Sequence, residues 1–562
     1  MARFVLVADS SLNASYRNFP LLDFLPSAPV EGIPKPIYNF LKGKPYKALP
    51  DGSISVTSYA LRKIEAALLQ RFPRNEVVLA HEKYLDRFIT DDTEIIGVDT
   101  MDPLGTGPVT MSYIALLKSK KGAWVTQEWL RLIRKINRIR KGKKAKLLIG
   151  GPGVWDFTLF PEELDKENID YAFQGESDDV ICDLFEQLPK GELNKDEFFE
   201  GYVTMDENFH RSLVKHPKFI SRSPKIGLGA PISKIPTIVA PAHGGMVEIM
   251  RGCGIGCDFC EVTLRPLRYY TNEMIIKEIE ANVRGGYDNA WLHTDEIFGF
   301  RHTKTNFEPN EEALIDLFKT VMSVKGVKRT NPTHGRISPA AAYPDLIKKL
   351  SEIIKAGPDN WIGMQVGVET GSDILAKRHM PNKTLPLHVG PDGTWREIVW
   401  EGTRNLNKYF WRPAFTLQVG QAEETDEDNW DSVALINQLS NGYVDNRPFE
   451  FTITPLQNVP MGLIKSREFS QITLSPSQLA VYYASYRHLY KMAVRNARLE
   501  SQRSGNKLAK FGTSTLISVG AWAMMEFVES IARKGGADIE KAKTYGLESP
   551  SKRIETISMI EK

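Results

Sequence analysis

The sequence has few cysteines and no apolar run long enough to cross a bilayer. Its 562 residues contain four cysteines, too few for a disulfide framework. The longest uncharged, apolar-leaning stretch, residues 511–525, is shorter than the ~18–20 residues that a membrane span needs. The apolar run at residues 4–8 is too short for the core of a signal peptide. We therefore expect a cytoplasmic protein without a membrane span.

The sequence also lacks a marked excess of charge of either sign. Lys and Arg number 72 against 69 Asp and Glu, which gives a net charge of +3. This balance gives no overall case for binding nucleic acid or a membrane surface. Hydrophobic residues make up 42% and charged residues 25%, values typical of globular proteins. The length predicts three or four domains, at roughly 100–200 residues each.

Residues 1–190 alternate between short apolar runs and segments with helical spacing of apolar residues. This pattern predicts an α/β, Rossmann-like domain with a parallel sheet, which binds ligands at the carboxyl ends of its strands. The expected strands are residues 4–8, 77–80, 94–99, 146–149 and 169–173. Five prolines lie between positions 217 and 241, so we expect residues 191–240 to form an extended linker.

Strand and helix patterns alternate again in residues 241–465. Six strand–helix units predict a partial (β/α)6 barrel, smaller than the eight-unit form. The expected strands are residues 247–250, 290–294, 333–337, 362–368, 414–419 and 449–454. Only helical patterns follow, and residues 466–562 are expected to form a C-terminal helical domain.

Three of the four cysteines lie on one predicted loop after the first barrel strand. Cys253, Cys257 and Cys260 form a Cys-x3-Cys-x2-Cys pattern, which favours an iron–sulfur cluster or zinc. Structural zinc needs a fourth ligand, and the nearest candidate is His243. Three thiolates on a 4Fe–4S cluster would leave one iron open to a cofactor. Zinc and chance clustering stay as alternatives, and we interpret Cys182 as a buried small residue in a helix.

The cysteine motif resembles that of the radical SAM enzymes. Arg251 and Gly252 precede the first cysteine, and the aromatic Phe259 precedes the third, as in that family. The resemblance covers roughly residues 246–462. It implies a 4Fe–4S cluster on Cys253, Cys257 and Cys260, and S-adenosyl-L-methionine (SAM) as a second cofactor.

Later segments carry the resemblance further. Thr294, Asp295 and Glu296 fall where the family contacts the amino group of SAM, although the usual Gly-Gly-Glu is absent. Glu369, in Gly-Val-Glu-Thr-Gly, is similar to a Gly-φ-Glu-Ser-Gly stretch of one large branch. Arg336, expected on the third barrel strand, is a candidate for the SAM carboxylate because guanidinium binds carboxylates bidentately.

The N-terminal domain resembles the cobalamin-binding domain that is fused to this branch. The residues that carry the resemblance, and that we expect at the cobalamin, are Gly150, Gly151, Pro152, Gly175 and Glu176. None of the ten histidines lies in an Asp-x-His-x-x-Gly motif, so cobalamin should bind without a histidine ligand from that motif. Its lower face should meet residues 9–16 or residues 99–106. The methylthiotransferase alternative needs three more cluster cysteines, which the sequence lacks.

The layout as a whole is similar to that of cobalamin-dependent radical SAM methylases, which implies methyl transfer to an unactivated sp3 carbon. The length and the helical C-terminus resemble the methanogen enzymes that methylate a glutamine in methyl-coenzyme M reductase, which implies a protein substrate. A low-potential electron donor such as flavodoxin or ferredoxin is also implied. One alternative is a radical SAM enzyme acting on a lipid or small molecule, by methylation or ring formation. The other is a non-enzymatic, zinc- or cobalamin-binding regulator.

Overall fold

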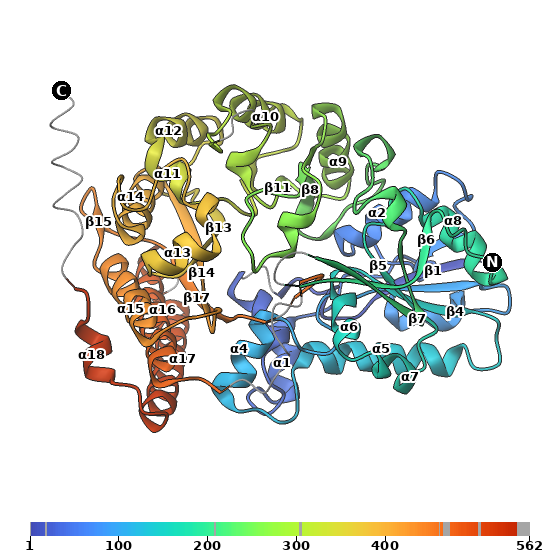
Figure 1. Cartoon of the computed structure of the whole chain (residues 1–562), viewed down its shortest axis with the longest axis horizontal. Coiled ribbons are helices and arrows are strands. Elements are labelled where there is room, and N and C mark those ends of the chain that lie inside the picture. The colour runs from blue at the N-terminus through green and yellow to red at the C-terminus, as the bar shows by residue number, and fades with distance from the viewer. Residues whose placement is uncertain are drawn as a thin grey trace.

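The computed structural model describes residues 2–16, 20–206, 210–302, 306–459, 461–464, 473–503 and 507–547. Two α/β units lie side by side, and a helical C-terminal unit packs against the second (Figure 1). Across the described ranges, no helix is long and apolar enough to cross a membrane.

The first unit is built on a seven-stranded sheet with the strand order β2-β1-β3-β4-β5-β7-β6. All neighbouring strands run parallel except β6 and β7, which form an antiparallel pair. The strands are β1 (Phe4–Ala8), β2 (Val77–Leu79), β3 (Ile95–Asp99), β4 (Lys146–Gly150), β5 (Tyr171–Gln174), β6 (Phe198–Met205) and β7 (Arg211–Arg222). The parallel, Rossmann-like sheet predicted from the sequence is confirmed.

Helices cover both faces of this sheet. Alternate residues of a strand point to opposite faces, so Phe4 and Leu6 of β1 join one apolar cluster while Val5 and Val7 join another. The first cluster is covered by α2 (Tyr59–Leu68) and α8 (Ile181–Gln187), and the second by α5 (Trp124–Ile139). Trp129 of α5 is buried in the second cluster. Burial on both faces explains why these strands are continuous apolar runs.

The stretch that we expected to be an extended linker contains two strands. In residues 191–240, β6 and β7 extend the sheet, and β7 pairs with β5 through Phe219 and Ala172. Most side chains in the first half of β7 are exposed, so the segment lacks the apolar run that would have marked it as a strand. The part after β7 is irregular, with short 3-10 turns at Pro224–Ile226 and Ile232–Lys234. The domain boundaries themselves stay a prediction.

The second unit is an arc of six parallel strands. The order is β8-β11-β12 in one sheet and β13-β14-β17 in another, and a parallel bridge between His334 and Gln365 joins them. The strands are β8 (Met246–Glu248), β11 (Asn289–His293), β12 (Arg329–Pro332), β13 (Ile362–Glu369), β14 (Trp411–Val419) and β17 (Thr452–Gln457). The longer helices between them are α9 (Asn272–Arg284), α10 (Glu311–Ser323), α12 (Pro344–Ile353), α14 (Trp395–Lys408) and α15 (Asp426–Ser440), and the shorter ones are α11 (Ser338–Ala342) and α13 (Asp373–His379). The partial barrel is therefore present.

Two barrel strands lie elsewhere than expected. The third was expected at residues 333–337, but β12 ends at Pro332, and Thr333 donates its hydroxyl hydrogen to the carbonyl of Thr294. Residues 333–337 therefore form the loop at the carboxyl end of the strand. The sixth strand, expected at 449–454, is β17 and begins at Thr452.

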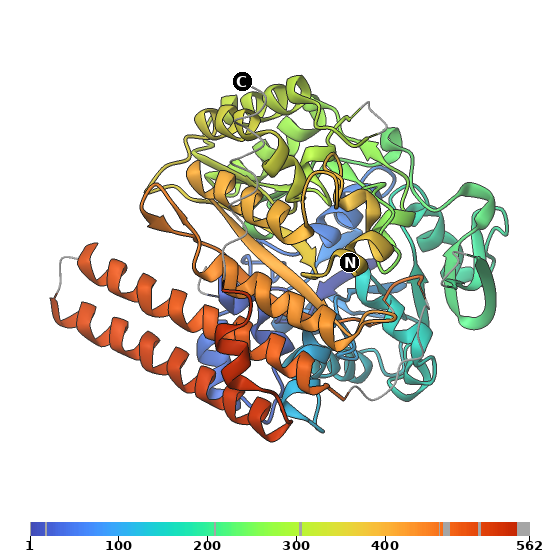
Figure 2. The same cartoon turned by 60° about the vertical axis from the view of Figure 1, so that its left-hand side comes forward.

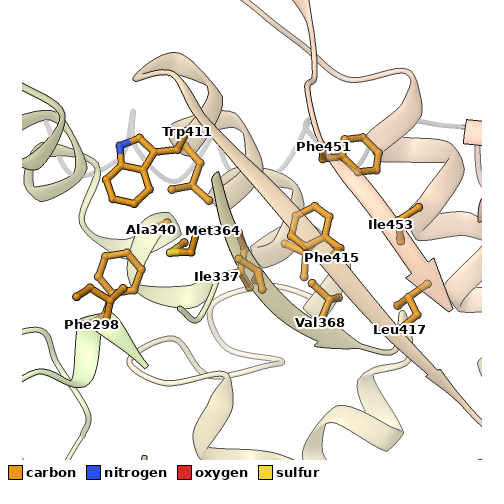
Figure 3. Close-up of a cluster of buried hydrophobic side chains, with 14 of the residues drawn as sticks. Phe298, Ile337, Ala340, Met364, Val368, Trp411, Phe415, Leu417, Phe451 and Ile453 are labelled. Atoms are coloured by element: carbon orange, nitrogen blue, oxygen red, sulfur yellow. The ribbon is translucent and has the colours of Figure 1, made fainter. Parts of the chain in front are cut away.

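Large apolar side chains fill the space between the barrel strands and their helices (Figure 3). Met364, Phe415 and Ile453 come from three successive strands and belong to one buried cluster. Trp411 is fully buried, and its indole nitrogen donates a 2.7 Å hydrogen bond to the hydroxyl of Ser351. This core fixes the strand ends that carry the site.

The C-terminal unit consists of α16 (Pro476–Arg503), α17 (Lys507–Lys534) and α18 (Ile539–Thr544). The two long helices form an antiparallel hairpin that projects beyond the barrel (Figure 2). Tyr482 and Tyr483 of α16 are buried in the same apolar cluster as the core of the barrel. The ring of His488 stacks on that of Phe451, with 3.8 Å between the ring centroids. The predicted helical pattern is thus present, with core packing for the tyrosines.

Candidate cofactor sites at the domain junction

The three clustered cysteines share one cavity. They lie on the loop that follows β9 (Met250–Arg251), and Cys253, Cys257 and Cys260 all line a cavity of about 320 Å³. β10 (Arg268–Tyr269) pairs with β9 and closes the base of the loop. The remaining cysteine, Cys182, lies in α8 and donates to the carbonyl of Ala67.

Gly252 allows the chain to enter this loop. Its φ is +76°, and a Cβ at this position would lie 2.6 Å from the carbonyl oxygen of Arg265. No other residue fits both the left-handed conformation and this close approach. The amide of Gly252 donates a 3.1 Å hydrogen bond to Asp295, which ties the start of the loop to the carboxyl end of β11.

Burial raises the pKa of the three thiols, and for Cys253 it does so to about 12. The ammonium of Lys383 opposes this effect at Cys257 and Cys260. In the described part of the chain, no group of three or more His, Cys, Asp and Glu side chains is placed to hold one metal ion. Three thiols on one loop, facing one cavity, nevertheless provide the donor set of a cluster with three protein ligands, which would bind as thiolates.

Asp295 and Glu296 face the cavity, whereas Thr294 does not. Asp295 and Glu296 both line it, and Glu296 forms an ion pair of 3.2 Å with Arg336. Thr294 is fully buried, and its hydroxyl accepts a hydrogen bond from the amide of Glu296. Thr294 therefore does not face the smaller cavity, and its hydroxyl holds the backbone of Glu296 in place.

Arg336 lies in the loop after β12 rather than on the strand where we expected it. Its guanidinium donates to the carbonyls of Leu385 at 2.7 Å and Phe307 at 3.0 Å, in addition to its pair with Glu296. Arg336 lines the cavity and is almost fully buried. Its expected pairing with a SAM carboxylate stays a prediction, and the residue already has three partners.

Phe259 and Glu369 also line the cavity, and their expected contact with a cofactor stays a prediction. A residue that we did not anticipate, Lys383, lies beside them. Its ammonium is 2.5 Å from Glu369 and 6.0 Å from the ring centroid of Phe259. Lys383 is the last residue of a short 3-10 helix, Pro381–Lys383, and no motif in the sequence marked it.

A second and larger cavity, of about 810 Å³, lies between the two α/β units. All five residues that we expected at a cobalamin line it: Gly150, Gly151, Pro152, Gly175 and Glu176. Gly151 has a φ of +91°, and a Cβ there would lie 2.7 Å from the carbonyl oxygen of Thr100. Residues at or just after the carboxyl ends of β1, β3, β4 and β5 line this cavity, as expected for a ligand site on a parallel sheet.

Both loops that we expected under a cobalamin also contribute to the second cavity. Ser11 and Tyr16 come from the loop after β1, and Asp99 and Met101 from the end of β3 and the loop that follows. Burial raises the pKa of Asp99 from 3.8 to about 6, although a 2.5 Å hydrogen bond from Ser58 opposes the shift.

Glu176 connects the two units as well as lining the cavity. Its carboxylate lies 3.0 Å from Arg251 and 2.6 Å from Arg268, the cross-strand neighbours at the base of the cysteine loop. Arg251 also pairs with Asp178 at 2.7 Å and with Glu248 at 2.8 Å. The cysteine loop is thereby fixed to the first unit.

The two cavities meet at Asp295, which lines both. Next to it, one short segment of the chain separates them: Val262 and Thr263 face the smaller cavity, and Glu261 and Arg265 face the larger one. A molecule at this junction would contact both.

Residues 247–436 match the family model described as the Radical SAM superfamily. This part of the chain is a radical SAM domain, which implies a 4Fe–4S cluster and SAM as cofactors. No curated protein matches the sequence.

Solved structures show similar folds. The "Cobalamin-dependent S-adenosylmethionine radical enzyme OxsB with aqua-cobalamin bound" is 12% identical, with a TM-score of 0.54 over 94% of this chain and 72% of that one. The radical SAM methyltransferase TsrM from Kitasatospora setae, with tryptophan and a SAM analogue bound, is 13% identical, with a TM-score of 0.45 over 76% and 70% of the two chains. The similarity to OxsB shows a common fold across both α/β units.

Proposed function

We propose that this protein is a cobalamin-dependent radical SAM methyltransferase that methylates an unactivated sp3 carbon. The observation that carries the proposal is the meeting of two cavities at Asp295. The three cysteines line one, and the carboxyl ends of the Rossmann-like sheet line the other. A reaction that uses two cofactors on one substrate needs such a junction, because the substrate carbon has to reach both.

Cys253, Cys257 and Cys260 would hold the cluster, and the strand-end glycines, chiefly Gly150 and Gly151, would let cobalamin approach the backbone. When bound, the cluster and SAM supply hydrogen abstraction from carbon, and cobalamin supplies the methyl group. The chain's own contribution is positioning. Asp295 holds the cysteine loop through the amide of Gly252 and offers a carboxylate to a cationic group in the smaller cavity.

For the substrate we propose a glutamine side chain in a protein, such as that of methyl-coenzyme M reductase. The support is the similarity of length and of the helical C-terminus to those methylases. This idea led us to expect an open cleft between the barrel and the C-terminal helices. Neither of the two cavities has that position, because their described lining residues come from the two α/β units and residues 456–463.

The position of the cavities favours a second candidate substrate. A lipid or small molecule that enters between the two α/β units, to be methylated or closed into a ring, needs no cleft at the C-terminal helices. A non-enzymatic regulator is the remaining alternative. Metal analysis after anaerobic purification tests it, since zinc without iron and sulfide would support a regulator.

The deciding experiment uses anaerobically reconstituted full-length protein with cobalamin, reductant and SAM that carries a labelled methyl group. Peptides with glutamine and extracts of small molecules and lipids are the candidate substrates, and mass spectrometry detects the product. We expect 5'-deoxyadenosine together with a product that carries one labelled methyl group. Cys257→Ala is the inactive control and Cys182→Ala the matched active one. 5'-Deoxyadenosine with an unlabelled ring product would contradict methyl transfer and retain the radical chemistry.

A further inference from the structure

One ammonium group is buried in the cavity of the cysteine loop. Lys383 lines this cavity together with the three loop cysteines, and its side chain is only 14% exposed. Burial alone would lower the pKa of Lys383, but the carboxylate of Glu369, 2.5 Å away, reverses the shift, so the side chain keeps its charge. A buried charge is costly to keep in a folded chain, and in a cofactor cavity it indicates a role toward the cofactor.

The backbone around Glu369 is adapted to hold this ion pair. Glu369 ends β13 with a φ of +65°, a left-handed conformation that residues with a side chain rarely adopt, and the register with β14 shifts at this point. A Cβ on Gly367 would lie 2.4 Å from the ammonium of Lys383 and 2.0 Å from the carboxylate of Glu369, so only glycine leaves room for the pair. Strained backbone of this kind is typical of functional sites.

The charge of Lys383 acts on the cysteines. Burial raises the pKa of Cys257 and Cys260, and at both thiols the ammonium opposes this effect more strongly than the carboxylate of Glu369 adds to it. Among the described residues that line the cavity, the other cation is Arg336, which already has three partners. Lys383 is therefore the lining residue that supplies positive potential at these sulfurs.

We propose that the ammonium of Lys383 raises the reduction potential of a 4Fe–4S cluster on the cysteine loop. The inference rests on the proposed function, which assigns a cluster to those cysteines. Reduction by one electron adds negative charge to the cluster, and a fixed positive charge in a cavity of low dielectric constant stabilises the reduced form. Glu369 holds the ammonium in place and, as an anion, acts in the opposite sense. Lys383 is thus a positioning residue whose role is electrostatic.

The test is a redox titration of the full-length protein after anaerobic reconstitution with iron and sulfide. Electron paramagnetic resonance measures the reduced cluster at each poised potential, without SAM. In Lys383→Met, the ratio of reduced to oxidised cluster at a fixed potential should fall about tenfold, which is a midpoint about 59 mV more negative. In Glu369→Gln the ratio should rise, because the ammonium loses its counter-charge. Lys377→Met is the matched control: it removes an exposed lysine from α13, where solvent screens the charge, so the midpoint should not change.

Lys383→Arg keeps the charge and should keep the wild-type midpoint, which separates the charge of this residue from its packing. Iron content and melting temperature, measured for every variant, show whether the loop still folds and holds a cluster. If Lys383→Met holds no cluster, Glu369→Gln decides, and a midpoint that is not more positive than that of the wild type overturns the inference.

A wild-type midpoint in Lys383→Met would also overturn it, as would shifts of Lys383→Met and Glu369→Gln in the same direction. An unchanged midpoint together with weaker binding of SAM, measured by equilibrium dialysis, would assign Lys383 to the SAM carboxylate instead. A wild type that takes up no iron and sulfide would overturn the proposed function and this inference with it, whereas opposite shifts in the two variants support both.

Discussion

The guanidinium of Arg251 lies 3.0 Å from the carboxylate of Glu176, so the residue before the cysteine loop is anchored on the other α/β unit. Both side chains are largely buried, and Arg268 binds the same carboxylate from the neighbouring strand. A single acid thus brings together two arginines that would repel each other across a β-hairpin. This contact joins the cysteine loop to the unit that supplies most of the lining of the larger cavity.

Replacing Arg251 should destabilise the junction. Arg251→Met leaves Glu248 and Asp178 buried without their main cation, and breaking a buried pair in this way costs about 3–5 kcal/mol. We expect a lower melting temperature and a lower denaturant midpoint in the apoprotein. Arg71→Met removes an exposed pair with Asp183 and should cost about 1 kcal/mol or less. Equal effects of the two substitutions would contradict the anchoring role of Arg251.

The three loop cysteines should be needed for iron, and the fourth should not. Alanine at Cys253, Cys257 or Cys260 removes one of three thiolates that line the same cavity, so iron and sulfide after anaerobic reconstitution should fall close to background. Cys182→Ala should keep the wild-type content, because this residue lies in α8, away from the cavity. Iron and sulfide analysis with the visible absorption spectrum makes the comparison. Full retention in a loop variant would count against a three-cysteine cluster.

Local patterns predicted much of the fold. Strands β1 to β5 are short apolar runs because both sheet faces are covered, and the cysteine spacing identified the loop that lines the smaller cavity. The hairpin β6–β7 was missed because half of it is exposed and its sequence includes Pro217. β12 was misplaced because the strand ends at Pro332, whereas His334, Gly335 and Arg336 line the smaller cavity.

Contacts between distant residues were beyond the reach of sequence patterns. Glu176 was expected at a ligand, yet it binds Arg251, 75 positions away, as well as lining the larger cavity. Lys383 carried no signal at all, because its role depends on the fold that places it 2.5 Å from Glu369. Such pairs are set by packing rather than by periodicity.

Gly252 should be intolerant of a side chain. Gly252→Ala adds a Cβ 2.6 Å from the carbonyl of Arg265 and has to keep a φ of +76°, a strained backbone that costs about 1–3 kcal/mol. The loop should relax away from Asp295, and we expect lower iron incorporation and a lower melting temperature. Gly357→Ala is the control, since a Cβ at that position would meet nothing within 4 Å and the φ there is not positive. Normal iron content in Gly252→Ala would show that the loop can adapt.

Asp99 should make the apoprotein less stable as the pH rises from about 4 to 6. The pKa of Asp99 is raised from 3.8 to about 6 by burial, so at pH 5 the folded chain keeps a proton that the unfolded chain has released. The unfolded state binds fewer protons in this window, and the contribution of Asp99 to the free energy of unfolding falls by about 3 kcal/mol in total. Below pH 4 the residue is protonated in both states, and above pH 6 it is ionised in both, so the loss then stays constant.

Asp99→Asn isolates this contribution. An amide oxygen can still accept the hydrogen bond from Ser58 and does not ionise, so the variant should be more stable than the wild type at pH 7 and about equally stable at pH 4. Thermal unfolding of both proteins across this pH range measures the difference. A variant that is less stable at pH 7 would mean that the Asp99 carboxylate is stabilised in the folded chain. Asp99 lines the larger cavity and lowers the stability of the folded chain at neutral pH. A buried acid of this kind is typical of a residue kept to bind a ligand.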